Sequence, residues 1–182
     1  MKKWMELLLA AALVGCGRGS DSAEAAGSVL AASDFEAVEG WMGDLATPSL
    51  TKEKAHSGTH SIAVRPGVDY GIGYSNALGK MSVSRPEKVK LTAWVFVPSA
   101  QVSTNLVVEV RDPGAAQALL WQGIDLKKEV KKFNEWQQLE KVITIPNTAK
   151  PDAIFKMYLW HAGGEQPVYL DDVTLTAAND EK

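Results

Sequence analysis

Cysteine is almost absent from this sequence of 182 residues, which contains only Cys16. A single thiol cannot form a disulfide within the chain, so a disulfide-stapled scaffold is excluded. Long hydrophobic runs are also absent after residue 15, where none approaches the roughly 20 apolar residues that a membrane-spanning helix needs. Any attachment to a membrane must therefore be made by other means.

Basic residues are slightly fewer than acidic residues. The chain has 19 Lys and Arg against 22 Asp and Glu, a formal net charge of −3, and it has no polybasic stretch. A surface of this kind does not attract nucleic acid, and it does not add electrostatic binding to a membrane. We therefore expect no nucleic-acid partner.

Catalytic motifs are missing as well. The sequence has no Gly-x-Ser-x-Gly elbow and no phosphate-binding glycine loop. His56 and His60 are four residues apart, but the intervening Ser57-Gly58-Thr59 predicts a turn rather than a helix, which argues against zinc ligation by this pair. A glycosidase would need two convergent carboxylates, whereas Glu109 stands alone between valines. The sequence therefore predicts a protein that is not an enzyme.

The first fifteen residues have the pattern of a secretory signal peptide. Lys2 and Lys3 precede the apolar run 7–14, and the segment ends in Leu-Val-Gly immediately before Cys16. This end resembles the lipobox of bacterial lipoproteins, which implies that Cys16 carries acyl chains such as palmitate after the signal is removed. The alternative is an ordinary signal peptide followed by a free thiol. The resemblance implies a cell-envelope location, and Gly17, in place of an aspartate, implies the outer membrane if the source has one.

The rest of the chain divides into three parts. Residues 16–28 are rich in Gly, Ser and Ala and predict a flexible tether. Residues 29–177 have a usual size for one domain with its own core. Residues 178–182 form a polar tail.

Strand patterns dominate the predicted domain. In 88–97, Val89, Leu91 and Val95 alternate with Lys90 and Trp94, which places them on opposite faces of a strand. Similar patterns, rich in β-branched and aromatic residues and separated by Pro and Gly, cover 61–65, 106–111, 136–145, 154–161 and 168–176. Only 126–133 could be a helix. The sequence thus predicts an all-β fold, an antiparallel β-sandwich or jelly roll.

The order of several short motifs resembles a known fold family. The motifs are Phe35-Glu36 followed by Trp41, then HSGTHSIAV over 56–64, LTAWVFV over 91–97, EWQQL over 135–139, and VYLDDVTL over 168–175. This order is similar to the galactose-binding-like β-sandwich, and most similar to carbohydrate-binding modules of families 4 and 9. The resemblance implies a non-catalytic module that binds poly- or oligosaccharides through aromatic side chains.

The resemblance also implies one structural calcium ion. Its ligands would be Glu36, the backbone around Thr59 and His60, and Asp171. Asp171 shares strand parity with Val173, so it is expected to point toward an apolar interior, where an unpaired carboxylate is costly. The alternative is that Asp171 caps a sheet edge or pairs with a lysine.

Candidate sugar-binding residues come from the aromatic side chains. Trp41 and Trp136 occupy motif positions where the family uses aromatics for packing, so both are interpreted as structural. The remaining candidates are aromatics that share a face with polar residues, or that lie in a loop or edge segment as Trp121 does, together with nearby polar side chains: Trp94, Trp121, Tyr158 and Trp160, with Glu109, Arg111 and Gln122 as partners. Core or rim packing is the alternative for each aromatic.

Two functions remain open from the sequence. The first is a lipid-anchored protein that captures polysaccharide or oligosaccharide at the cell envelope. The second is a structural or interaction lipoprotein that uses the same sandwich to bind an envelope protein, because one scaffold can host many functions.

Overall fold

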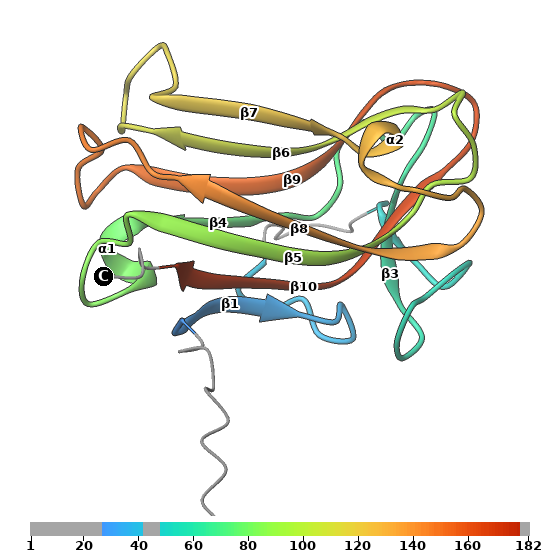
Figure 1. The fold of residues 1–182 in the computed structure, drawn as a ribbon, viewed down its shortest axis with the longest axis horizontal. Coiled ribbons are helices and arrows are strands. Elements are labelled where there is room, and N and C mark those ends of the chain that lie inside the picture. The colour runs from blue at the N-terminus through green and yellow to red at the C-terminus, as the bar shows by residue number, and fades with distance from the viewer. Residues whose placement is uncertain (1–26, 42–47, 179–182) are drawn as a thin grey trace, which may run out of the picture.

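A computed structural model describes residues 27–41 and 48–178, in which strands predominate and helices are limited to single turns (Figure 1). The elements, in chain order, are β1 (Val29–Ser33), β2 (Leu50–Thr51), β3 (Ser61–Val64), β4 (Tyr74–Ala77), α1 (Leu78–Met81), β5 (Lys88–Phe96), β6 (Ser103–Arg111), β7 (Leu120–Asp125), α2 (Leu126–Glu129), β8 (Trp136–Thr144), β9 (Ile154–Gly163) and β10 (Val168–Ala178).

The strands form two antiparallel sheets that pack face to face (Figure 1). One sheet has the order β2-β3-β10-β5-β8, and β1 also pairs with β10; the other has the order β4-β9-β6-β7. β1 and β3 lie in tandem along β10, because β3 pairs with 168–170 and β1 pairs with 173–176. The predicted all-β antiparallel sandwich is confirmed.

The alternation read from the sequence accounts for the strand faces. In β5, Val89, Leu91 and Val95 are buried, whereas Lys90 and Trp94 are partly exposed. Strands β1, β2 and β4 were not predicted, because each is short and has no clear alternation. β7 is an edge strand, which is one of the two expectations for the segment around Trp121.

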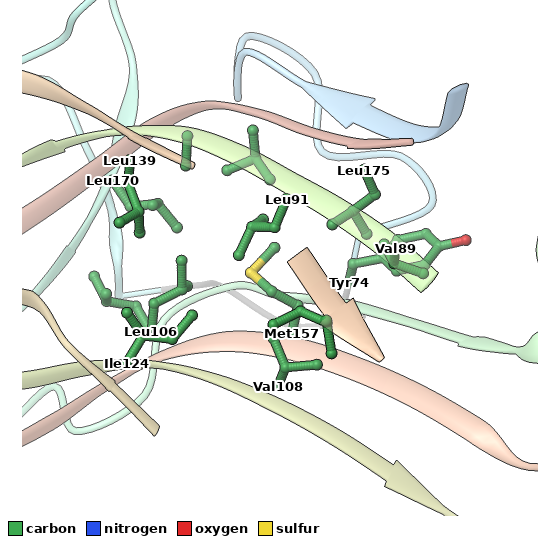
Figure 2. Close-up of a cluster of buried hydrophobic side chains, with 14 of the residues drawn as sticks. Tyr74, Val89, Leu91, Leu106, Val108, Ile124, Leu139, Met157, Leu170 and Leu175 are labelled. Atoms are coloured by element: carbon green, nitrogen blue, oxygen red, sulfur yellow. The ribbon is translucent and has the colours of Figure 1, made fainter. Parts of the chain in front are cut away.

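The core lies between the sheets and is filled by apolar side chains from both (Figure 2). Leu91 and Leu170 from one sheet face Leu106 and Met157 from the other, and all four are fully buried. Burial of such side chains contributes about 1.5–3 kcal/mol each and is the main stabilising term. Trp41, 8% exposed, packs edge-on against Phe35 at a ring distance of 5.3 Å, as its structural interpretation requires.

A β-bulge in β10 changes which way Asp171 faces. Asp171 pairs with Trp94 on β5, the register shifts between Asp171 and Thr174, and Asp172 has a φ of 45°. A bulge inserts one extra residue and reverses the alternation beyond it. Asp171 therefore lies on the outer face of the six-stranded sheet, whereas Val173 lies in the core. The prediction that Asp171 shares the apolar interior with Val173 is wrong for this reason.

Among the described residues, no helix has the length and apolar character needed to cross a bilayer. The signal peptide, Cys16 and most of the predicted tether, which extends to residue 28, lie outside the described residues.

Candidate functional site: an open aromatic face

The outer face of the four-stranded sheet, together with the segment before β4, brings aromatic side chains next to polar ones. Strand pairing aligns Trp121 with Glu109 and Lys156, Val107 with Gly123 and Tyr158, and Asn105 with Trp160, which is bridged to Tyr70. Paired residues share a face, and so do residues two apart along a strand. We call this surface the open face; it consists of Tyr70, Asn105, Val107, Glu109, Trp121, Gly123, Asp125, Lys156, Tyr158 and Trp160.

Trp121 lies across Gly123 and forms a platform on the open face. A Cβ atom added to Gly123 would stand 3.0 Å from Cη2 of the Trp121 ring, so the indole rests directly over this glycine. Trp121 meets Trp160 edge-on, with ring centroids 6.2 Å apart, and remains 52% exposed. A flat, exposed ring of this kind can pack against the C–H side of a sugar ring.

Tyr158 connects the platform to a fourth aromatic side chain. Burial raises the pKa of the Tyr158 hydroxyl, and a side-chain hydrogen bond with Trp121 acts in the opposite direction. On its other side, Tyr158 contacts Tyr70 at a ring distance of 5.9 Å. Tyr70 is 62% exposed and was missed by the sequence analysis, because its segment has no strand periodicity. The one available signal was its position among glycines and tyrosines in 69–74 (DYGIGY).

Glu109 is the central carboxylate of the open face. It is only 7% exposed, and its Oε1 accepts a hydrogen bond of 2.7 Å from Nε of Arg111. Nη1 of Arg111 donates to the carbonyl oxygens of Ala115 and Ala116, at 3.4 and 2.8 Å. Arg111 is thus occupied in holding the β6–β7 hairpin and in orienting Glu109.

Two candidates from the sequence do not lie on this face. Gln122 pairs with Val108, a core residue, so its position in β7 belongs to the inner side of the edge strand. Trp94 belongs to the other sheet, where the imidazole of His56 stacks on its ring at 3.8 Å with an interplanar angle of 13°. The structure thus brings together Trp121, Tyr158, Trp160 and Glu109, and Arg111 contacts Glu109. Trp94 and Gln122 lie apart from this group.

The β2–β3 loop, residues 52–60, covers the outer face of the six-stranded sheet near Trp94. Lys54 lies over the Phe96 ring at 4.6 Å, and the Tyr169 hydroxyl donates to Glu53 at 2.9 Å. Trp136 packs edge-on against Phe96 at 5.7 Å, which agrees with its structural interpretation. We call this surface the covered face; it consists of Trp94, Phe96, Trp136, Tyr169 and the 52–60 loop.

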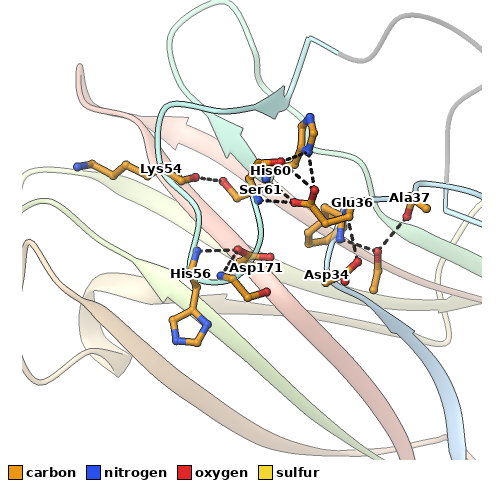
Figure 3. A network of polar contacts seen from close by, with 12 residues as sticks. Asp34, Glu36, Ala37, Lys54, His56, His60, Ser61 and Asp171 are labelled. Carbon is orange, nitrogen blue, oxygen red and sulfur yellow. Dashed lines mark hydrogen bonds and ion pairs between the residues drawn. The ribbon is translucent and has the colours of Figure 1, made fainter.

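Two carboxylates of β10, Asp171 and Asp172, hold the loop in place, and Figure 3 shows the contacts of Asp171. Asp171 is fully buried and accepts hydrogen bonds from the backbone N–H groups of His56 and Ser57, at 2.7 and 3.2 Å. Burial raises the pKa of Asp171, and these N–H groups oppose that shift. Asp172 accepts from the Ser57 hydroxyl at 2.6 Å and contacts Nδ1 of His56 at 2.5 Å.

Glu36 holds the end of the same loop from the β1 side (Figure 3). Its Oε1 accepts the backbone N–H groups of Thr59 and His60, both at 2.6 Å, and its Oε2 accepts the Thr59 hydroxyl at 2.8 Å and contacts Nδ1 of His60 at 3.0 Å. The Thr59 N–H, followed by the other donors, lowers the pKa of Glu36 from 4.5 to about 2.

In this arrangement hydrogen bonds already engage the carboxylates that the family resemblance assigns to a calcium ion, and the ion itself stays a prediction. Calcium takes six to eight oxygen ligands, and a carboxylate offers about four lone-pair positions. On Glu36 three positions accept hydrogen bonds and the fourth contacts Nδ1 of His60, and on Asp171 three positions accept, including one from the N–H of Asp172 at 2.8 Å. Residues 27–41 and 48–178 contain no group of three or more His, Cys, Asp or Glu side chains placed to hold a metal. The loop is attached by hydrogen bonds to these carboxylates.

Comparison with known proteins supports the fold. No protein-family model matches the sequence, and no curated protein matches it. The chain is similar to the CBM22-1 xylan-binding domain of Paenibacillus barcinonensis Xyn10C, with a TM-score of 0.55 and 20% identity over 86% of this chain and 98% of that one. It is also similar to the C-terminal family 22 carbohydrate-binding module of Clostridium thermocellum Xyn10B, with a TM-score of 0.54 and 17% identity over 85% and 96% of the two chains.

These likenesses show that the chain has the β-sandwich fold of carbohydrate-binding modules. The two matched modules belong to family 22, whereas the sequence motifs pointed to families 4 and 9. The numbered family therefore stays a prediction.

Proposed function

We propose that this protein is a non-catalytic lipoprotein of the cell envelope whose open face binds an oligo- or polysaccharide. The observation that carries the proposal is the platform formed by Trp121, Tyr158 and Trp160, with Tyr70 at its edge and Glu109 beside it. Exposed aromatic rings next to a few oriented polar groups are the usual composition of a sugar site. The matched structures, described as xylan-binding, support the same class of ligand.

The carboxylates of the open face support a binding role rather than hydrolysis. Besides Glu109, the face has Asp125, which pairs with Asn105 and forms an ion pair with Lys128 at 3.2 Å. Glu109 and Asn105 are four residues apart on β6, which places the strand positions of the two carboxylates about 13 Å apart. Glycosidases hold their two carboxyl groups about 5–9.5 Å apart.

The anchor is supported by sequence alone, because Cys16 lies outside the described residues. Lipid on Cys16 would attach the sandwich to the membrane through residues 17–28. Replacement of Cys16 by Ser should move the protein from the membrane fraction to the soluble fraction. If the protein with Cys16→Ser stays in the membrane fraction, the lipid anchor is refuted.

The binding proposal is tested by titrating the chain with xylan, β-glucan, mannan and peptidoglycan fragments. Trp121→Ala and Trp160→Ala should each weaken binding about 10-fold or more, as expected for aromatic anchors at a binding site. Trp94→Ala is the matched control, since it removes a tryptophan from the covered face and should leave the affinity unchanged while lowering stability.

Two outcomes would contradict the proposal. One is that no glycan binds to the folded protein. The other is that an envelope protein co-purifies with the chain and its binding survives loss of Trp121 and Trp160. The second result would favour the interaction lipoprotein.

A further inference from the structure

We propose that Lys156 makes the open face selective for acidic saccharides, those that carry the carboxylate of a uronic acid. The inference rests on the proposed function and adds a ligand class to it. Lys156 was not among the candidate residues selected from the sequence.

Some of the charged groups on the open face are already engaged by neighbouring residues. Arg111 is occupied by Glu109 and by the carbonyl groups of Ala115 and Ala116. Glu109 uses Oε1 for Arg111, which leaves Oε2 to accept from a ligand. Lys156 makes no hydrogen bond or ion pair with any residue in 27–41 or 48–178. The charge of Arg111 is therefore compensated by Glu109, whereas the charge of Lys156 is not, and Oε2 of Glu109 can accept a hydrogen bond from a ligand.

The charges of Lys156, Glu109 and Arg111 do not cancel. Lys156 lies directly across from Glu109 in the β6–β9 pairing, and Glu109 is already neutralised by Arg111 at 2.7 Å. The three side chains together carry one net positive charge. An amino sugar would meet this excess charge unfavourably, a neutral sugar would leave it uncompensated, and a uronate would neutralise it.

Lys156 also shares a face of β9 with aromatic residues of the site. Lys156 is partly buried and lies two residues before Tyr158 on β9, so the two side chains project from the same face of the sheet. Ser75 on β4 is its other cross-strand neighbour and brings no charge. An ammonium group beside apolar rings is less screened than one on a free surface, which strengthens its attraction to a carboxylate.

The test compares oligosaccharides that differ only in the carboxylate. We would titrate the chain with an oligogalacturonide and its methyl ester, and with a xylo-oligosaccharide with and without one glucuronate branch. In at least one pair, the acid should bind about 5- to 10-fold more tightly than its neutral counterpart, as one charge-assisted contact predicts. Raising the salt concentration should reduce this preference.

Variants of Lys156 test whether this residue causes the preference for acidic saccharides. Lys156→Gln should abolish the preference and its salt dependence while leaving the affinity for the neutral member within about twofold, and Lys156→Arg should retain most of it. Lys52→Gln is the control, because Lys52 is an exposed lysine on the covered side of the sandwich. It should change neither affinity.

The outcomes separate this inference from the proposed function. If glycans bind and Trp121→Ala weakens them, but acid and neutral members bind equally, the selectivity is refuted and the function stands. Unchanged selectivity in Lys156→Gln also refutes the role of Lys156. If no glycan of either kind binds to the folded chain, both proposals fail.

Discussion

The two outer faces of the sandwich both carry tryptophan among polar residues, but on one of them a loop covers the tryptophan. On the covered face, His56 stacks on Trp94 and the 52–60 loop continues over Phe96. On the open face, Trp121 rests on Gly123 with its other side open to solvent. Strand alternation is the same in both sheets, so it is the loop, and not the strand, that decides whether an outward aromatic can bind a ligand.

Releasing the loop should have the largest effect on this contrast. Asp171→Ala leaves the N–H groups of His56 and Ser57 without their acceptor, and we expect a loss of about 2–4 kcal/mol in the free energy of unfolding. Chemical denaturation measures this loss. Asp152→Ala, in an exposed turn, is the control and should change stability by less than about 0.5 kcal/mol. A loss below about 1 kcal/mol for Asp171→Ala would mean that Asp171 does not hold the loop.

Disturbing the open face should change binding rather than stability. The Cβ of Gly123→Val would stand 3.0 Å from the Trp121 ring and force it off its position. We expect the glycan affinity to fall about 5-fold, which corresponds to about 1 kcal/mol. Glycan titration measures the affinity, and denaturation should show little change because β7 is an edge strand. Gly114→Ala, in the hairpin loop with a φ of 75°, should show the reverse pattern, with some loss of stability and unchanged affinity.

The Glu36 contacts predict a pH dependence for the covered side. The folded-state pKa of about 2 lies below the ordinary value of 4.5, so ionised Glu36 stabilises the fold above about pH 4.5, and this contribution is lost as the pH falls toward 2. Thermal unfolding of Glu36→Gln should show a lower midpoint than wild type at neutral pH and converge with it near pH 2. Glu39→Gln, at an exposed position, should track the wild type throughout. Parallel curves for Glu36→Gln and wild type would contradict this role.

Calcium should have the smallest effect. Because donors already face the oxygen atoms of Glu36 and Asp171, adding calcium or a chelator should leave the unfolding midpoint unchanged within about 1 °C. A midpoint several degrees higher with calcium would show that the ion displaces these donors. Such a result would restore the metal site that the family resemblance implies.

The sequence predicts the fold correctly where the pattern of apolar and polar residues lies within one strand. Alternation in β5 placed Val89 and Leu91 in the core and Trp94 outside, and the structure agrees. The facing of Asp171 could not be predicted, because the bulge at Asp172 depends on contacts with residues more than 100 positions away in the sequence. A period-two pattern carries no sign of one extra residue.

The candidate site was predictable in part for a similar reason. Tyr158 and Trp160 share a face within one strand, so parity sufficed to group them. Trp94 met the same criterion, but its partner His56 lies in a distant loop. Tyr70 contributes from a segment with no periodicity, and only the bridge to Trp160 brings it to the site.

The pairing of β1 with β10 has a mechanical consequence. β1 belongs to the six-stranded sheet, whereas the open face lies on the opposite layer. A lipid before β1 and a polymer on the open face would pull on different layers, so tension would pass through β1, β10 and the core. β1 is paired at only four positions and begins at the exposed Val29, so under load we expect it to peel away before either sheet opens.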